Sequence, residues 1–211
     1  MRFEIWLMFS LAYLVTTLSP GPNVLLVLKN SVQHGWKSAF ITVLGNLSCQ
    51  FIIVCLVAIG VGELLKELPA WFIAMKVTGG IYLIYLGVKS LRSTRKSAID
   101  LPVDRPRAKN KSVGNLFSQA FLVSASNPKT LIFLSAFLPQ FLDVEHLPIE
   151  QFSLMFISIC VIVATVHLGY AYLINRIGQR VLTQDFSRTL SKVTGGLFIT
   201  LGGGVLLSSR A

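Results

Sequence analysis

Long apolar stretches with almost no charge recur six times along the chain of 211 residues. They cover residues 5–28, 38–62, 69–88, 112–142, 151–175 and 193–209. Lys76 and Lys129 are the only charged residues inside them. A bilayer core about 30 Å thick needs about 20 residues of helix, so each stretch can cross it. The pattern therefore predicts an all-α polytopic membrane protein with six transmembrane helices.

The composition also favours a lipid environment. Apolar residues make up 53% and charged residues 13%, about half the roughly 25% charged residues of soluble proteins. The net charge of +10 could indicate nucleic-acid binding, but the basic residues lie between apolar runs instead of clustering on a polar surface. Cys49, Cys55 and Cys160 lie inside apolar runs without the spacing of a metal site. We expect contact with membrane lipid, no nucleic acid, no metal and no cofactor.

The loops between the predicted helices differ strongly in charge. The loops after the first, third and fifth helices hold fourteen Lys and Arg residues, whereas the opposite side holds Arg2, Lys66 and Arg210. The positive-inside rule then places the fourteen in the cytoplasm and both termini outside. The loop at 93–111 divides the single domain, residues 1–211, into a first half of about residues 1–92 and a second of about 112–211.

Two matches relate these halves to each other. Residues 9–16 match residues 117–124 at an offset of 108, and the pentapeptide KVTGG at 76–80 recurs at 192–196. Each half holds three helices, an odd number, so equivalent helices run in opposite directions. Inverted repeats of this kind are typical of secondary transporters. Lys76 and Lys192 then mark membrane boundaries and need no transport role.

Glycines spaced by seven residues occur in both halves. Gly80 with Gly87, and Gly195 with Gly202, share one face of their helices. Small residues allow close helix packing in membranes, so we expect these faces to join the repeats or to support a homodimer.

Prolines predict a break in the first helix and another in the fourth. The sequences are Ser19-Pro20-Gly21-Pro22-Asn23 and Ser126-Asn127-Pro128-Lys129. Proline removes a helical hydrogen bond, which frees the carbonyls of Thr16, Leu18 and Ser124. Unwound backbone at membrane depth occurs only inside protein or beside a watery cavity. A simple kink would explain one break, but paired breaks at equivalent positions favour a binding site.

The direction of the half-helices predicts what this site binds. The halves that follow the breaks turn their N-termini, the positive ends of their dipoles, toward the interior, and such ends bind carboxylates. Lys129 adds a positive charge there, and the freed carbonyls of Thr16, Leu18 and Ser124 can accept from an ammonium group. No Asp or Glu lies within any predicted helix. His167, the only histidine within them, is either a hydrogen-bonded core residue or a proton carrier that couples transport.

These motifs resemble one family. The block Ser19–Asn23, the HGWK sequence at 34–37, the GGIYL sequence at 79–83, Asn127-Pro128-Lys129 and the PQF sequence at 139–141 resemble the LysE/RhtB family of amino-acid exporters. The resemblance covers nearly the whole chain and is greatest to the RhtB-like branch. It implies a multi-pass inner-membrane protein, not an enzyme, that exports neutral amino acids such as threonine, homoserine or leucine. The resemblance implies an acidic residue near Gln50 in many members, whereas this chain has a neutral residue there. This departure argues against coupling through a carboxylate at that position.

Two alternatives remain at this point. An intramembrane serine protease would need a G-x-S-G nucleophile, which the chain lacks, although it has His167. A transporter of another small zwitterion would use the same charged groups. A channel is less favoured because nothing in the sequence resembles a filter loop or a ring of charge.

Overall fold

The computed structural model describes residues 1–67, 69–92, 112–142, 146–177 and 184–207. Within these ranges the elements are all helical. In chain order they are α1 (Phe3–Leu18), α2 (Pro22–His34), α3 (Trp36–Glu67), α4 (Pro69–Arg92), α5 (Val113–Ala125), α6 (Pro128–Ile132), the π-helical turn η2 (Phe133–Phe137), the 3-10 turn η3 (Leu138–Phe141), α7 (Pro148–Ile177) and α8 (Gln184–Leu207).

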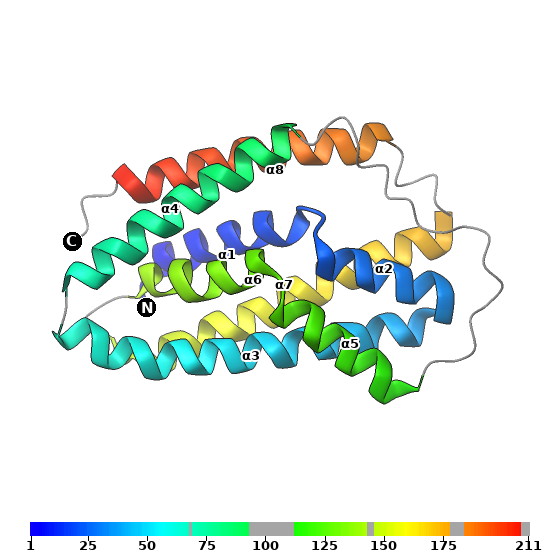
Figure 1. The fold of residues 1–211 in the computed structure, drawn as a ribbon, viewed down its shortest axis with the longest axis horizontal. Coiled ribbons are helices and arrows are strands. Elements are labelled where there is room, and N and C mark those ends of the chain that lie inside the picture. Colours follow the sequence, from blue (N-terminus) through cyan, green and yellow to red (C-terminus); the bar gives the residue numbers. More distant parts are fainter. Residues whose placement is uncertain (68, 93–111, 143–145, 178–183, 208–211) are drawn as a thin grey trace.

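The helices form an elongated bundle. The long helices α3 and α7 pack on each other, α5 packs along α3, and α4 pairs with α8. The start of α1 and the end of α8 lie at one end of the molecule, and the turn between α2 and α3 lies at the other (Figure 1). Gly35 makes that turn with φ 85°, a left-handed conformation that glycine adopts without strain.

The two predicted breaks are present. α1 and α2 meet at an angle of 55°, and α5 meets the segment Pro128–Phe141 at 60°. The second half of the fourth predicted helix differs from expectation, because it is α-helical only to Ile132 and continues as η2 and η3. Pro139 lies within η3 and has no N–H for a regular helical bond, which accounts for the tighter final turn.

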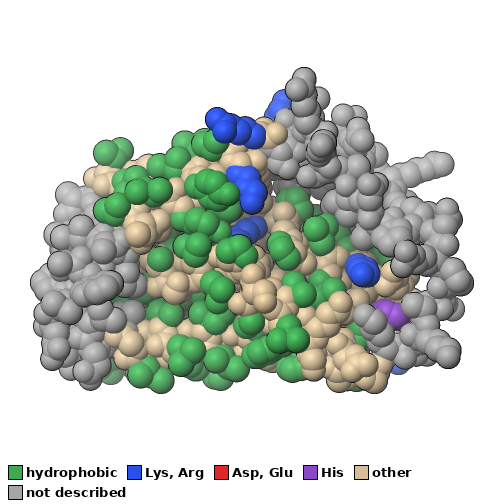
Figure 2. Space-filling model, in the orientation of Figure 1, with side chains coloured by type: hydrophobic (Ala, Val, Ile, Leu, Met, Phe, Trp, Pro, Cys, Tyr) green, Lys and Arg blue, Asp and Glu red, His purple; other side chains and the backbone are tan. Residues whose placement is uncertain are grey.

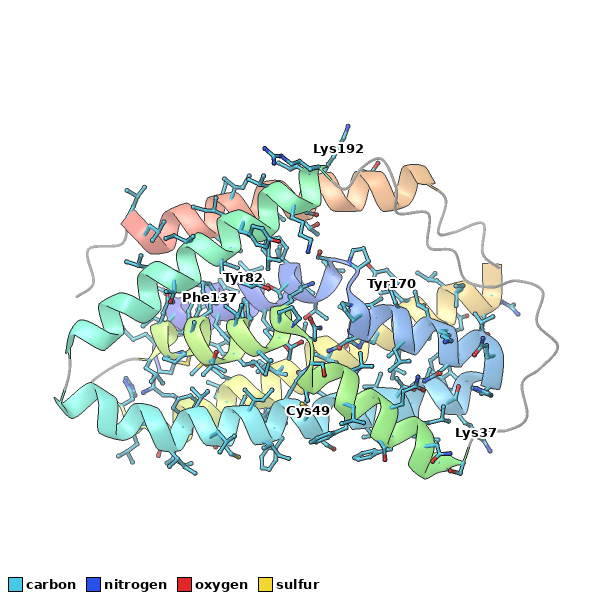
Figure 3. The ribbon with its side chains drawn as sticks, viewed as in Figure 1. Lys37, Cys49, Tyr82, Phe137, Tyr170 and Lys192 are labelled. Carbon is cyan, nitrogen blue, oxygen red and sulfur yellow. The ribbon has the colours of Figure 1, made fainter. Side chains whose placement is uncertain are left out.

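The outer surface is strongly apolar. Large hydrophobic side chains such as Ile59, Leu122 and Ile157 are more than half exposed, and Figure 2 shows hydrophobic side chains over much of the described part of one face. A soluble monomer rarely exposes so much apolar area, whereas lipid covers it at no cost. Lys192 projects away from α8, as expected of a boundary residue (Figure 3). The side chain of Lys76 lies outside the described residues.

The described helices provide two to four candidate membrane spans. By length and composition, α3 and α7 can cross a membrane, and each bent pair adds one more if it is a single span, which gives two to four. α4 and α8 have 24 residues each, about 36 Å of helix, which is long enough to cross a bilayer core, but part of each lies outside the residues whose side chains are described. The prediction of six spans therefore remains a prediction.

Aromatic side chains fill the core between α1 and the segment that follows the second break. Phe9 packs edge-on against Phe141, with ring centroids 5.5 Å apart, and Tyr13 packs in the same way against Phe133 at 5.3 Å. Phe9 and Phe133 are almost fully buried. These contacts hold the α1 half of the first broken helix against the later half of the second.

The predicted glycine faces pack on each other within one chain. A Cβ atom at Gly202 would lie 2.7 Å from the carbonyl oxygen of Gly80, and one at Gly87 would lie 2.7 Å from that of Gly195. Real side chains do not approach backbone so closely, so only glycine allows α4 and α8 this separation. Of the two roles predicted for these glycines, the structure shows the joining of the two halves.

We expect Gly202→Ala to lower the thermal stability of the detergent-solubilised protein. The added methyl group meets both Gly80 and the backbone of Ile84, and overpacking of this kind typically costs about 1–3 kcal/mol. Gly203→Ala is the matched control, because a Cβ atom at Gly203 has no neighbour within 4 Å. Thermal unfolding of both variants measures the difference, and equal melting temperatures would contradict the packing.

Candidate functional site

The first break is built around an extended glycine. α1 ends at Leu18, and Gly21 has φ −142° and ψ −177° before Pro22 begins α2. The Gly21 carbonyl accepts the first α2 bond, from the Leu25 N–H at 2.9 Å. Proline suits the first helical position because its missing N–H would have no partner there. The N-terminus of α2 therefore lies at the break, with Asn23 in its first turn.

The second break uses an asparagine cap. The Asn127 side-chain oxygen accepts a hydrogen bond from the Lys129 backbone N–H at 3.1 Å, and Pro128 takes the first helical position. This is the usual geometry of a helix start, in which a short polar side chain satisfies a free N–H. The local sequence thus explains both the end of α5 and the position of Lys129 immediately after it.

The structure brings the two breaks together. The Lys129 ammonium donates to the carbonyl oxygen of Ser19 at 2.8 Å, across 110 positions of sequence. The Asn23 amide donates to the hydroxyl groups of Ser124 and Thr130, both at 3.3 Å. Lys129 also lies over the Phe198 ring of α8, 5.9 Å from its centroid. The predicted meeting of the two breaks around Lys129 is therefore observed.

A cavity lies at this meeting point. It is an open hollow of about 400 Å³, a volume that includes the space at its mouth. Like typical ligand sites, it combines apolar walls with a few polar groups. The lining residues are Tyr13, Thr16, Thr17, Ser19, Gly21, Asn23, Val24, Gln50, Asn127, Lys129, Thr130, Phe133, Val163 and His167.

The charge in this cavity is positive. Lys129 is the only formally charged side chain among the lining residues, and no Asp or Glu is among them. The side-chain oxygen of Asn23 and Nδ1 of His167 are buried and have no hydrogen-bond partner among the described residues. Buried polar atoms of this kind are usually satisfied, so they point to water or a ligand. The arrangement suits a small molecule with a carboxylate and further polar groups.

The predicted site residues divide into two groups. Seven line the cavity, namely Thr16, Ser19, Gly21, Asn23, Asn127, Lys129 and His167. Four are not among its lining residues, namely Pro20, Pro22, Pro128 and Ser124. The prolines set the helix breaks, and the Ser124 hydroxyl accepts from Asn23. The second group therefore positions the first.

The freed carbonyls are less available than the sequence suggests. The Tyr170 hydroxyl donates to the Leu18 carbonyl at 3.0 Å, and Figure 3 shows Tyr170 on the neighbouring helix α7. The Asn127 N–H donates to the Ser124 carbonyl at 3.2 Å. Two of the three predicted acceptors thus have protein partners already. The Asn23 side-chain oxygen, which is buried and has no partner among the described residues, is a further acceptor.

Sequence reasoning missed part of the lining. Tyr13 and Thr17 come from α1, Gln50 from α3, Thr130 and Phe133 from the segment after the second break, and Val163 from α7. Tyr13 and Thr17 are four residues apart and so share a helix face, which was a usable signal. Among the described residues, no group of three His, Cys, Asp or Glu side chains lies close enough to hold a metal ion.

Comparisons with known proteins agree on one family. The family model described as LysE type translocator matches residues 14–209. The homoserine/homoserine lactone efflux protein of Salmonella typhimurium is 32% identical over 210 residues, which cover 100% of this chain and 99% of that protein. The leucine efflux protein of Salmonella choleraesuis is 32% identical over 191 residues, covering 86% and 85%. A protein of Vibrio cholerae named as an uncharacterized membrane protein is 28% identical over 215 residues, covering 99% and 98%. No solved structure matches the chain.

Proposed function

The chain belongs to the LysE type translocator family, and we propose that it is a secondary transporter that exports neutral amino acids or their derivatives across the inner membrane. The relatives named for efflux of homoserine, homoserine lactone and leucine support this substrate class. The observation that carries the proposal is the cavity at the paired breaks, where Lys129 is the single charged group.

The binding step follows from the chemistry of the lining. Every amino acid carries a carboxylate, which Lys129 and the N-terminus of α2 attract together. The Lys129 ammonium has three donors, of which one is bonded to the Ser19 carbonyl, so others remain for the substrate. The substrate ammonium would be held by neutral acceptors, with the Asn23 oxygen and the Thr16 hydroxyl in the same lining. A receptor for these two groups tolerates several neutral side chains.

The proposed architecture has six spans in two inverted repeats. Repeat 1 takes about residues 1–92, a cytoplasmic linker takes 93–111, and repeat 2 takes about 112–211. The glycine contacts between α4 and α8 support it, because Gly80 meets Gly202 while Gly87 meets Gly195. A two-fold axis that exchanges the helices would convert one contact into the other. In this relation Gly80 corresponds to Gly195 and Gly87 to Gly202, an offset of 115 residues. The KVTGG match has an offset of 116, one residue more.

We propose the orientation from charge, with both termini outside and the linker in the cytoplasm. In intact cells, a membrane-impermeant thiol reagent should therefore label a cysteine placed at position 2 and leave one at position 100 unlabelled. The fourteen-to-three division of basic residues gives the reason. Cell lysis should make position 100 reactive, which controls for accessibility. Labelling at position 100 but not at position 2 in intact cells would reverse the orientation.

Flux across a sealed membrane tests the function itself. Reconstituted vesicles should show saturable transport of homoserine, threonine or leucine that depends on an ion gradient. Cleavage of a substrate in detergent, without vectorial transport, would instead support the intramembrane enzyme. Transport of a different small zwitterion, with none of these amino acids carried, would support the second alternative.

A further inference from the structure

Tyr13 and Gln50 form a polar pair in the cavity wall that carboxylate binding does not use. The Tyr13 hydroxyl donates to the Gln50 side-chain oxygen at 2.9 Å, between α1 and α3. Both side chains are at most 4% exposed and both line the cavity. This bond occupies the Gln50 side-chain oxygen, so the two N–H groups of its amide are not used by it. An amide donor is therefore present in the wall, next to a tyrosine hydroxyl that can also accept.

We propose that this pair recognises a hydroxyl or carbonyl oxygen on the substrate side chain, and so selects small hydroxylated amino acids over aliphatic ones. This inference rests on the proposed function and assigns the substrate class within it. It identifies Gln50 and Tyr13 as specificity-determining residues in the cavity that Lys129 also lines.

The spacing along α1 fits such a substrate. Tyr13 precedes Ser19, whose carbonyl holds the Lys129 ammonium, by six residues, or roughly 9 Å at 1.5 Å per residue. A carboxylate bound at Lys129 thus leaves room for a short side chain before the Tyr13–Gln50 pair.

The surrounding walls restrict the pair to this role. Val24, Phe133 and Val163 line the same cavity and provide packing for methylene groups. The edge-on contact between Tyr13 and Phe133 holds the tyrosine ring in place. A substrate hydroxyl accepts from the Gln50 amide and donates to the Tyr13 oxygen, which satisfies both groups. An aliphatic side chain removes water from the Gln50 amide and offers no partner, which is unfavourable.

A matched pair of substrates tests the proposal. Homoserine and norvaline have side chains of equal length that differ by a terminal hydroxyl in place of a methyl group. In competition for flux into vesicles, the unaltered protein should prefer homoserine, and Gln50→Leu should lower that preference at least about tenfold. Tyr13→Phe should lower it in the same direction. Norvaline transport by Gln50→Leu should be maintained or increased.

Asn46→Leu is the matched control, because it removes a buried amide one turn earlier on α3. Asn46 is not among the cavity-lining residues, and neither atom of its amide has a partner among the described residues. The Asn46→Leu variant should prefer homoserine over norvaline as strongly as the unaltered protein does. An equal loss in Asn46→Leu and Gln50→Leu, or equal transport of both substrates by the unaltered protein, would overturn the inference. Absence of flux for every neutral amino acid would instead overturn the proposed function.

Discussion

Replacing Lys129 with methionine is expected to abolish export of free amino acids and to weaken transport of carboxylate-free lactones or amides much less. Methionine keeps the length of the side chain but removes the charge that attracts the carboxylate. Losing one charge-assisted contact in a partly desolvated site costs about 1.5–3 kcal/mol, or roughly ten- to a hundredfold in affinity. Fluxes of homoserine and homoserine lactone into the same vesicles measure the difference.

The contact between Lys129 and Ser19 requires a control for folding. Methionine leaves the Ser19 carbonyl without its 2.8 Å donor, so some thermal stability should be lost together with binding. Lys129→Arg keeps the charge but replaces a compact ammonium with a planar fork, and it should recover stability more than transport. Equal loss of transport for the amino acid and the lactone would show that Lys129 serves folding or coupling instead of carboxylate binding.

The double substitution Pro20→Ala with Pro22→Ala is expected to abolish transport while the protein still inserts into the membrane. Alanine restores the missing N–H groups and favours a continuous helix through the 55° bend. α2 has 13 residues, about 20 Å, so straightening would move its far end by roughly 18 Å. Winding Gly21 into the helix would also turn the Asn23 side chain away from Ser124 and Thr130. Export from cells, normalised to membrane abundance, measures the loss.

Pro148→Ala gives the matched control for that experiment. Pro148 is the exposed first residue of α7, distant in sequence from both breaks, and it does not line the cavity. Its substitution should leave export near that of the unaltered protein. Neither Pro20 nor Pro22 lines the cavity, so a loss in the double variant acts through the backbone. Normal export by the double variant would mean that the prolines only kink the helix.

The positions of the breaks were predictable because proline chemistry is local. Pro22 and Pro128 each begin a half-helix, as their missing N–H groups require. The meeting of the breaks was also predictable, since the matches between the halves place them at equivalent positions. What joins them, the bond from Lys129 to the Ser19 carbonyl, follows from the folded geometry of four separate helices.

Other features depend on tertiary packing and had no clear signal. Gln50 reaches the cavity because α3 presents that face to α1, and apolar runs do not specify rotation about the helix axis. The Tyr170 bond to the Leu18 carbonyl also requires α7 to lie beside the break. α8 begins at Gln184, nine residues before the predicted span at 193. Charged residues limit an apolar run, but they do not end a helix that continues beyond the lipid.

The glycine contacts between α4 and α8 have a consequence for how such a chain could arise. In the proposed inverted repeats the two glycine contacts are equivalent, so a dimer of a three-helix ancestor would form a single contact twice if its copies were inserted in opposite orientations. Duplication and fusion of that gene would inherit the interface already complete. The fused copy would need only a connecting segment, after which each half could diverge. Co-expression of the two halves as separate chains would recreate that ancestral arrangement.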